Sequence, residues 1–483
     1  MSSSRVALLW SFAERYASLV ISIGSTMLLA RLLTPAQVGI YSVCAAVTTV
    51  AGILRDFGVS EYLIQEKELN RDKIRAAFGV AIIIAWTIGS AVFLSRGWIA
   101  EYLGEPGVAE VLAVLALNFL ILPLSSPAFA LMNRELAFRP IFALQVSCNA
   151  VSASVTVFLA FKGYGYMALA WGPVINVLTQ TLILAWTRPA QSFMIPGFKE
   201  ARTVLRFGSM YVSSRVVEVL SRNFHEPIIA KKFGFEAVGL FSRAYGLIDL
   251  FHKNIGAAVL RVATPAFAAE HRANRPVADA FSRSTAIFTS ISWPFFGFIA
   301  LASHEVVLVM FGAQWTAAAP LATILAITAL PWGPLTLVPQ MLSATGHVGR
   351  RLKVALLICP IHMALVYLGS LFDLHAVAAA WLLSNTAMLL LYLRHLREAL
   401  GISAAQIFRP CVGSAVVALT STGVMALALS LARQLAFPEL LSILFTLLAG
   451  AVTWLLVVRN LSHPVLAEVN RFIASARQRL QHG

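Results

Sequence analysis

The sequence consists largely of apolar segments of about 20 residues, and this feature constrains the fold more than any other. A helix of that length crosses the hydrocarbon core of a bilayer and satisfies its own backbone hydrogen bonds there. Charged residues make up only 12% of the chain, against about 25% in a soluble domain. We therefore predict an all-α polytopic membrane protein with about fourteen spans. The spans lie at roughly residues 6–30, 38–57, 76–95, 108–131, 140–161, 165–187, 206–230, 237–259, 279–302, 319–343, 353–371, 375–394, 409–431 and 439–458.

The sequence also contains an internal repeat. Residues 30–42 and 230–242 both begin with Ala and a basic residue, and both end in Val-Gly, an aliphatic residue, an aromatic residue and Ser. The segment Ala168-Leu-Ala-Trp171 returns as Ala378-Ala-Ala-Trp381. A duplicated membrane bundle is typical of transporters, whose similar halves can rock about a shared site.

The repeat and the spacing of the spans predict the domain organisation. The expected parts are an N-terminal six-helix lobe at 1–187, a cytoplasmic connector at 188–205, a second six-helix lobe at 206–395, an extra helix pair at 396–460 and a basic cytoplasmic tail at 461–483. An even number of spans gives both lobes the same orientation, so an axis along the membrane normal should relate them. The tail is interpreted as an amphipathic surface helix or a solvated segment.

Basic residues are distributed unevenly between the loops. With a cytoplasmic N-terminus, the inside loops and the tail carry about 27 Lys and Arg, and the outside loops carry about six. This asymmetry predicts that both termini are cytoplasmic. It also accounts for the formal net charge of +15 without a nucleic-acid partner. Glu14 and Arg15 interrupt the first apolar segment, which favours a retained helix over a cleaved signal peptide.

One face of the seventh span is polar. Arg215, Glu218, Arg222 and His225 follow one another at i, i+3, i+7 and i+10, which places them on one side of a helix. The first span carries Arg15 and three serines at the same offsets. A charge at mid-bilayer costs about 2.5–3.5 kcal/mol. The two stripes are therefore expected to face one another across a central, water-filled cleft.

The chemistry of such a cleft suits an anionic substrate, because a guanidinium can donate two parallel hydrogen bonds to a phosphate. The candidate substrate-binding residues are Arg15, Arg215, Arg222, Arg243, Arg31 and Arg55. Two alternatives remain open. The arginines of the seventh span can pair with Glu218 between helices. Alternatively, Arg15 and Arg215 can snorkel to the cytoplasmic interface, and Arg31 and Arg55, at span ends, can anchor their helices at the interface.

Acidic residues within the spans point to energy coupling, because a carboxylate can bind H⁺ or Na⁺ in one conformation and release it in another. The candidate coupling residues are Glu218, His225, Glu14 and Asp56. Glu218 is also a counter-ion for its arginine neighbours, which opposes its protonation, and His225 can equally be a hydrogen-bonded packing residue. No further cofactor and no metal site is predicted, since the four cysteines lack metal-ligand spacing.

The tenth span contains Pro331, Pro334 and Pro339. Proline removes a backbone hydrogen bond and bends a helix, so this span is expected to be bent, whether as a mobile or a static kink. The sequence has no Walker A loop, no HExxH and no Gly-x-Ser-x-Gly, and its longest loops, near 56–75 and 260–280, are short and basic. The chain is therefore predicted not to be an enzyme.

Three segments of the sequence carry a recognisable pattern. They are Ala30-Arg-Leu-Leu-Thr-Pro-Ala-Gln-Val-Gly-Ile-Tyr41, then Arg55-Asp-Phe-Gly58, and the connector Asn133-Arg-Glu-Leu-Ala-Phe-Arg139. In these segments the sequence resembles the polysaccharide transporters of the MOP flippase superfamily, the Wzx-type O-unit and exopolysaccharide flippases. The resemblance runs over nearly the whole chain. The Leu-Leu-Thr-Pro segment is its specific part, and the rest is hydropathy and repeat layout.

The resemblance implies two six-helix lobes in a V, alternating access, and basic residues in the central cavity. It implies translocation of an undecaprenyl-diphosphate-linked oligosaccharide from the cytoplasmic to the periplasmic leaflet of the bacterial inner membrane, for lipopolysaccharide or exopolysaccharide assembly. A polysaccharide polymerase and a chain-length regulator are the implied partners. The alternatives are a lipid II flippase, a multidrug exporter of the same superfamily, and a polysaccharide polymerase. The arginine-rich stripe argues against cationic drugs, and a polymerase would need a large periplasmic loop.

Overall fold

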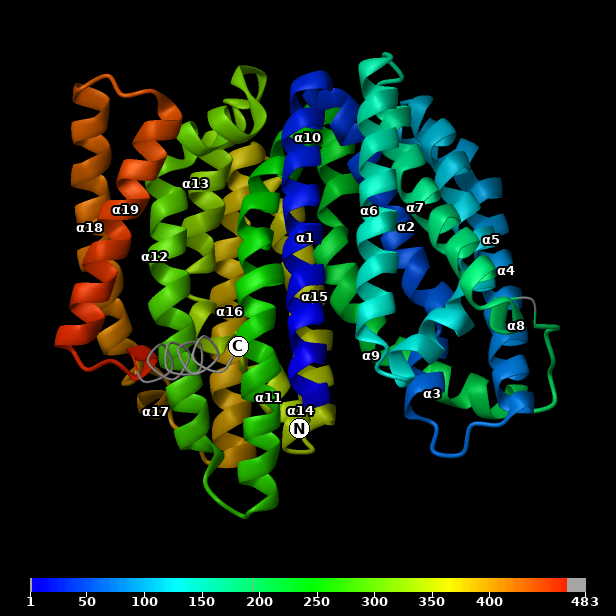
Figure 1. Ribbon diagram of the computed structural model, residues 1–483. Helices are drawn as coiled ribbons and strands as arrows, with labels where there is room; N and C mark the ends of the chain where they lie inside the picture. Colours follow the sequence, from blue (N-terminus) through cyan, green and yellow to red (C-terminus); the bar gives the residue numbers. More distant parts are fainter. Residues whose placement is uncertain (1, 193, 467–483) are drawn as a thin grey trace. The chain divides into compact units, whose positions relative to one another are not determined.

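The computed structural model describes residues 2–192 and 194–466, apart from the side chains of residues 2–9, 12, 210, 214 and 218. Over these ranges the chain is helical and contains no strand (Figure 1), so the all-α fold class is confirmed. The chain divides into two compact units, Met1–Gly239 and Leu240–Gly483. Most of the predicted basic tail at 461–483 lies outside the described residues.

The first unit holds the helices up to α9 and the start of α10. These helices are α1 Ser2–Leu32, α2 Pro35–Asp56, α3 Val59–Gln65, α4 Arg71–Leu103, α5 Gly107–Arg134, α6 Phe138–Phe161, α7 Tyr166–Thr187, α8 Pro189–Ser192, α9 Ala201–Asn223 and α10 His225–Phe251. The second unit holds the remaining elements. They are η1 His252–Gly256, α11 Ala257–Arg272, α12 Val277–Phe311, η2 Ala313–Trp315, α13 Ala318–Ala329, η3 Gly333–Leu335, α14 Val338–Ala344, α15 Val348–Gly369, α16 Leu374–Leu400, α17 Ala404–Phe408, α18 Cys411–Gln434 and α19 Glu439–Asn460.

Ten of the described helical segments are long and apolar enough to cross a membrane, and a bent pair formed by α13 and α14 would make an eleventh. The predicted count of about fourteen is therefore not confirmed. Three helices outside this set, α1, α9 and α10, have the length to span but carry many polar residues, and α9 is the most polar of the three. They are the helices on which the sequence places most of the candidate site.

Helix α2 has sharply defined ends. At its start, Thr34 and Gln37 form a capping box, in which each side chain accepts a hydrogen bond from the other residue's backbone N–H. Pro35 at the first helical position supplies the required φ. At its other end, Phe57 and Gly58 adopt left-handed φ values of 42° and 65°, and these two residues separate α2 from α3.

Helix α9 packs against this break through two small residues. A Cβ atom at Gly208 would lie 2.0 Å from the Phe57 ring, and one at Gly58 would lie 2.8 Å from the Tyr211 ring. Each aromatic ring therefore fits where the opposite element has no side chain. Through these contacts α9 lies on α2, α3 and α4 of the first unit.

The compact units consequently divide within α10, whereas the predicted lobe boundary follows the repeat and lies at 188–205. The physical reason for the difference is the packing of α9 on α2, α3 and α4. The two repeated segments do share a structural feature. Each contains an interruption of helix, after Leu32 in the first and at Gly234, with φ 81°, in the second. The V-shaped arrangement of the lobes stays a prediction.

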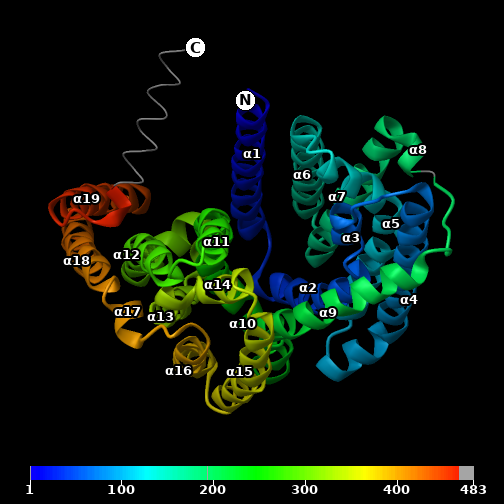
Figure 2. The ribbon, with the colours of Figure 1, turned by 90° about the horizontal axis from the view of Figure 1, so that it is seen from below.

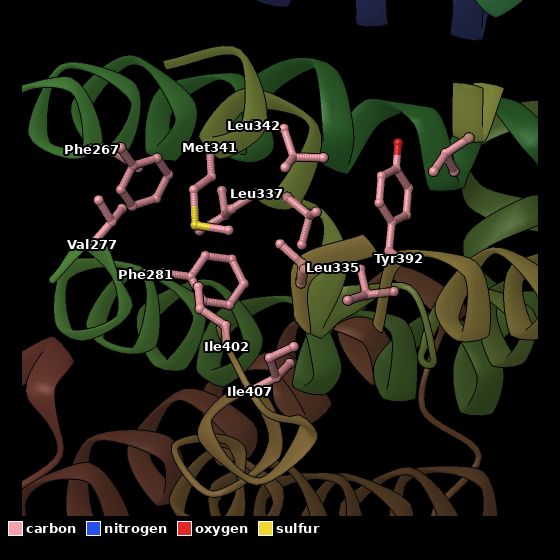
Figure 3. Close-up of a cluster of buried hydrophobic side chains, with 14 residues drawn as sticks. Phe267, Val277, Phe281, Leu335, Leu337, Met341, Leu342, Tyr392, Ile402 and Ile407 are labelled. Carbon is pink, nitrogen blue, oxygen red and sulfur yellow. The ribbon is translucent and has the colours of Figure 1, made fainter. Parts of the chain in front are cut away.

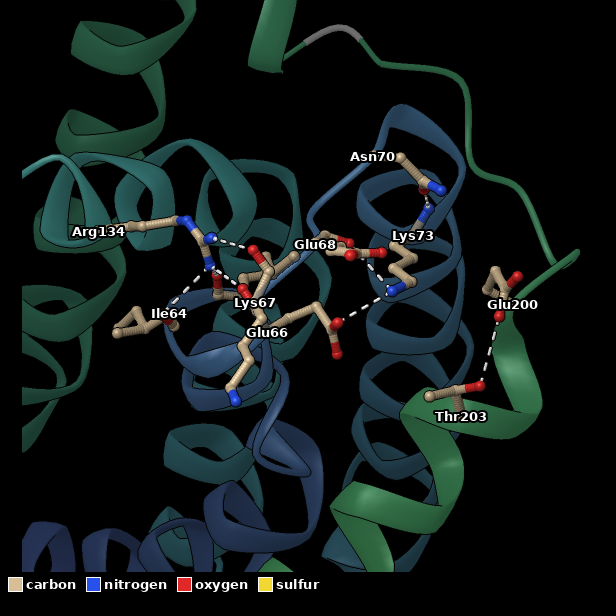
Figure 4. A network of polar contacts seen from close by, with 10 residues as sticks. Ile64, Glu66, Lys67, Glu68, Asn70, Lys73, Arg134, Glu200 and Thr203 are labelled. Carbon is tan, nitrogen blue, oxygen red and sulfur yellow. Dashed lines mark hydrogen bonds and ion pairs between the residues drawn. The ribbon is translucent and has the colours of Figure 1, made fainter.

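A polar network orders the loop between α3 and α4 (Figure 4). The guanidinium of Arg134, at the end of α5, donates to four backbone carbonyls over 2.6–3.4 Å, those of Leu63, Ile64, Glu66 and Lys67. The Lys73 ammonium binds the Glu66 carboxylate at 2.9 Å and thereby lowers the pKa of Glu66. The basic loop near 56–75 thus contains both a helix and an ordered network.

The segment near 260–280 was predicted to be a loop, but within it only residues 273–276 lie outside helices. The chain is helical without interruption from Phe235 to Arg272, through α10, η1 and α11. Helix α11 is rich in alanine and places Ala263 and Phe267 in the hydrophobic core. Alanine is the strongest helix former, and the two buried residues lie four apart on one face.

The tenth predicted span is bent, as its prolines indicate. Helix α13 and the segment Gly333–Ala344 form an angle of 52°. Pro334 lies in η3 and Pro339 in the first turn of α14, where a proline replaces an N–H that has no partner within the helix. The bend therefore lies where new helices begin, and these two prolines interrupt no backbone hydrogen bonds within a continuous helix.

A hydrophobic cluster surrounds this bend (Figure 3). Leu335 and Met341 are fully buried there against Phe267 of α11, Phe281 of α12 and Tyr392 of α16. Burial of one such side chain stabilises a fold by about 1.5–3 kcal/mol. The cluster therefore fixes the bent segment to α11, α12 and α16.

Helices α18 and α19, the predicted extra pair, lie side by side and pack on α12 (Figure 2). The indole N–H of Trp454 in α19 donates to the Ser290 carbonyl of α12 over 2.7 Å. Arg433 in the last turn of α18 binds Glu305 of α12, with Nε and Oε1 2.6 Å apart. The Glu305 side chain is 7% exposed and that of Arg433 is 54% exposed, so the ion pair has one buried and one solvated member.

This asymmetry makes a prediction. Arg433→Ala should destabilise the protein by about 2 kcal/mol, because it leaves the Glu305 carboxylate buried without a counter-ion. Glu305→Gln should cost about 1 kcal/mol or less, because Arg433 can turn to solvent. Thermal unfolding of the purified protein in detergent measures both. Lys199→Ala, which breaks the exposed pair with Asp72, is the control and should stay within about 0.5 kcal/mol. Equal losses of stability from the two substitutions, or a larger loss from Glu305→Gln, would contradict the conclusion that Glu305 is the buried member of the pair.

Candidate functional site

The predicted substrate-binding arginines lie mainly on the three polar helices. Arg15 and Arg31 are on α1, Arg215 and Arg222 on α9, and Arg243 on α10. A helix of this polarity can lie within a membrane only where part of its surface meets water or other protein. Their composition therefore marks these helices as the candidate site.

Arg215 and Arg222 are both exposed and, seven residues apart, share one face of α9. Arg215 Nη1 donates to the hydroxyl of Tyr211 over 3.5 Å, and that hydroxyl donates to Glu61 over 2.7 Å. Tyr211 thus links Arg215 to the carboxylate of α3 and restrains its position. The side chain of Glu218 lies outside the described side chains, so the pairing alternative for this face stays open.

A chain of hydrogen bonds joins α1, α6 and α7 in the first unit. Asn176 Nδ2 donates to Asn149 Oδ1 over 3.1 Å, and Asn149 Nδ2 donates to Ser18 Oγ over 3.0 Å. Ser18 Oγ in turn donates to the Glu14 carboxylate over 3.4 Å. All four side chains are half-buried. Each donor points toward Glu14, so these hydrogen bonds tie that carboxylate to α6 and α7.

Arg55 and Asp56 are brought together. Arg55 Nη2 and Asp56 Oδ1 lie 2.7 Å apart, and the Arg55 guanidinium lies 5.2 Å from the centre of the Phe119 ring. Arg31, exposed at the end of α1, donates to the Met27 carbonyl over 3.4 Å. Both arginines thus make contacts that anchor helix ends, and their role in substrate binding stays a prediction.

Arg243 lies in the second unit. Its guanidinium carbon is 5.7 and 5.4 Å from the ring centres of Phe311 and Trp315, both of which are nearly fully buried. These cation–π contacts hold the half-buried Arg243 against η2. His225, at the start of α10, is only 2% exposed and lies edge-on to the Phe224 ring, as expected of a packing residue. Its predicted coupling role stays untested.

The two asparagines and Tyr211 were not among the predicted site residues, because none of them carries a charge. Asn149 and Asn176 lie within the apolar spans predicted at 140–161 and 165–187, where an amide without a partner would be costly. This cost is the signal in the sequence from which the two asparagines could have been predicted as hydrogen-bonded residues. Within the described part of the chain, no cluster of three or more His, Cys, Asp or Glu residues could hold a metal ion.

Comparison with known proteins identifies the family. Residues 28–320, more than half of the chain, match the family described as polysaccharide biosynthesis protein. The chain is similar to the lipopolysaccharide biosynthesis protein WzxC of Escherichia coli K12, with 23% identity over 326 residues that cover 66% of each protein. It is also similar to the teichuronic acid biosynthesis protein TuaB of Bacillus subtilis, with 24% identity over 329 residues, 66% of this chain and 67% of TuaB. The match spans just under two thirds of WzxC.

Two solved structures share the fold. The lipid II flippase MurJ, in an inward closed conformation, has a TM-score of 0.75 at 12% identity, over 94% of this chain and 99% of MurJ. An inward-facing multidrug resistance MATE family transporter of the MOP superfamily has a TM-score of 0.66 at 13% identity, over 80% and 94%. Taken with the sequence relatives, these folds are those of membrane transporters and not of enzymes. The chain belongs to the polysaccharide biosynthesis protein family.

Proposed function

We propose that this protein translocates an undecaprenyl-diphosphate-linked oligosaccharide from the cytoplasmic to the periplasmic leaflet of the bacterial inner membrane, with both termini cytoplasmic. Its product would serve lipopolysaccharide or exopolysaccharide assembly. The observation that carries the proposal is the pair of exposed guanidinium groups, Arg215 and Arg222, on one face of a helix too polar to be surrounded by lipid. The family and the relatives' roles in polysaccharide biosynthesis suggest the class of substrate.

The physical task is to carry a charged head group past hydrocarbon. A diphosphate or a sugar without partners is costly there, whereas the polyprenyl chain can remain in lipid. Guanidinium groups supply paired, charge-assisted hydrogen bonds to phosphate oxygens. Tyr211 and Glu61 restrain one of these groups before the substrate arrives, which lowers the entropy lost on binding. Exposure of this face first to one side of the membrane and then to the other completes translocation by alternating access.

The test of the function is a chromosomal deletion followed by mass spectrometry of lipid-linked oligosaccharides. Surface polysaccharide should disappear and the undecaprenyl-linked unit should accumulate on the cytoplasmic side. The MurJ-like fold makes a lipid II flippase the rival with the same head-group chemistry, and loss of that activity would be lethal. Altered drug susceptibility with normal surface polysaccharide would instead indicate a multidrug exporter. Co-purification would reveal a polymerase or a chain-length regulator as partner.

The site itself makes a sharper prediction. Arg215→Ala and Arg222→Ala should each reduce export at least tenfold, because each removes a charge-assisted hydrogen bond of about 1.5–3 kcal/mol. Complementation of the deletion strain, with membrane expression checked, measures the effect. Arg206→Ala is the matched control: Arg206 is exposed on the same helix, and nine residues from Arg215 it lies on roughly the opposite face. Normal export by the double variant would remove both arginines from the site.

For energy coupling we propose Glu14, because three donors in succession direct hydrogen bonds toward its carboxylate. A carboxylate tied to several helices can bind H⁺ or Na⁺ in one conformation and release it when those helices move. Glu14→Gln should abolish the dependence of transport on an ion gradient, whereas Glu101→Gln, at an exposed position of α4, should not. A protonophore or replacement of Na⁺ identifies the ion. Gradient-dependent transport by Glu14→Gln would exclude this role.

A further inference from the structure

A cavity of about 670 Å³ lies where α16 ends and α17 begins, within the second unit. Figure 2 shows α17 between α16 and α18. The cavity is lined by Leu393, Arg394, Arg397, Glu398, Ser403 and Ala404. None of these residues belongs to the candidate transport site. The predicted topology puts this end of α16 at the cytoplasmic surface of the membrane.

Positive charge is in excess around this cavity. Glu398 binds two arginines at once, Arg394 through Nε at 3.0 Å and Arg350 of α15 through Nη1 at 3.3 Å. Within the described part of the chain, Arg397 has no carboxylate at ion-pair distance. Three guanidinium groups are thus balanced by one carboxylate. The site attracts an anion and disfavours a ligand that brings its own ammonium group.

The surface leading to the cavity is apolar. Leu383 and Leu390 are 59% and 62% exposed, and their spacing of seven residues continues to Arg397 along one face of α16. The rise from Leu390 to Arg397 is about 10 Å. Exposed leucines on an apolar span face lipid tails, and arginines one to two turns further along meet the head groups. This order matches the tail and head of a membrane lipid.

We propose that this cavity holds the head group of an anionic phospholipid. Arg397 and Arg394 donate to its phosphodiester oxygens, and its acyl chains lie along Leu383 and Leu390. A guanidinium suits the phosphodiester because it donates through a planar fork. Basic pockets on the cytoplasmic side of membrane helices recognise such lipids. A zwitterionic lipid lacks the net negative charge that the excess of two positive charges selects.

The experiment uses purified full-length protein in detergent and native mass spectrometry. Phosphatidylglycerol should bind and raise the unfolding temperature, whereas phosphatidylcholine with the same acyl chains should not. Arg397→Gln should weaken phosphatidylglycerol binding about tenfold. Arg272→Gln, at an exposed arginine in the last turn of α11, should leave it unchanged. Arg397→Lys, which keeps the charge and loses the fork, should be intermediate and serves if the glutamine variant fails to fold.

Three results would overturn the proposal. Equal binding of the two lipids would mean that acyl packing and not charge selects the ligand. Full displacement by millimolar inorganic phosphate would mean a small-anion site. Unchanged binding by Arg397→Gln would place the lipid elsewhere. None of these results bears on the deletion phenotype or on Arg215, so the transport proposal stands or falls separately.

Discussion

Gly39→Ala is expected to destabilise this protein more than any other single methyl addition. A Cβ atom at Gly39 would lie 1.8 Å from the carbonyl oxygen of Phe235, and one at Gly239 would lie 1.9 Å from that of Pro35. Both contacts are within the first unit, and they are reciprocal: the two repeated segments meet backbone to backbone. A carbonyl cannot rotate away as a side chain can, so the helices must separate by more than 1 Å, at a cost of at least about 3 kcal/mol.

Thermal unfolding in detergent and the yield of monodisperse protein measure this effect. The matched control is Gly97→Ala on α4, where nothing lies within 4 Å of the added Cβ. It should be neutral or stabilising by up to about 1 kcal/mol, because alanine is the better helix former. The double variant at positions 39 and 239 should cost little more than either single one, since one separation relieves both clashes. Additive costs, or a stable Gly39→Ala, would contradict the close approach.

The second large effect is expected for Arg134→Ala. Its guanidinium donates to four carbonyls at the end of α3 and in the loop to α4 (Figure 4). Water can replace part of this contact because the region is only half-buried. We therefore expect a loss of about 2–3 kcal/mol, less than the sum of four charged hydrogen bonds. Arg134→Lys should recover only part of it, because an ammonium cannot span the same carbonyls with a planar fork.

Limited proteolysis locates the consequence. Arg134→Ala should expose the 66–70 loop and accelerate tryptic cleavage after Lys67. Arg71→Ala is the control in the same region, an exposed residue in the first turn of α4. Its removal should be neutral or slightly stabilising, because a positive charge is unfavourable at a helix start. Cleavage at the wild-type rate in Arg134→Ala would show that the loop is held by other contacts.

Much of the fold could be predicted because the bilayer imposes a local rule. The spans predicted at 76–95, 108–131 and 140–161 fall inside α4, α5 and α6. Both the length of an apolar segment and the polar residues that end it can be read from consecutive residues. The bend at 331–339 was predictable for the same reason: proline acts on its own turn. The helix α11 was missed because its charged residues resemble those of a loop.

The candidate site was only partly predictable. The repeated offsets selected Arg15, Arg215 and Arg222 as residues too polar for lipid, and the structure places them on helices that are not apolar enough to cross a membrane unaided. Their neighbours could not be found in this way. Tyr211 meets Glu61 across 150 residues, and Asn149 meets Ser18 across 131. No periodicity along a single helix encodes such a pairing.

The sequence by itself determined that the chain crosses a membrane many times, which helices carry the charge, and where one span bends. Each of these follows from transferring consecutive residues into lipid, a cost that is set locally. Only the tertiary structure decided that α9 packs on α2, α3 and α4, that Gly39 and Gly239 lie against opposite backbones, and that Arg134 caps a distant helix. Those contacts depend on how helices fit together in three dimensions. Only in the folded chain does a glycine meet the backbone against which it packs, and a guanidinium the carbonyls to which it donates.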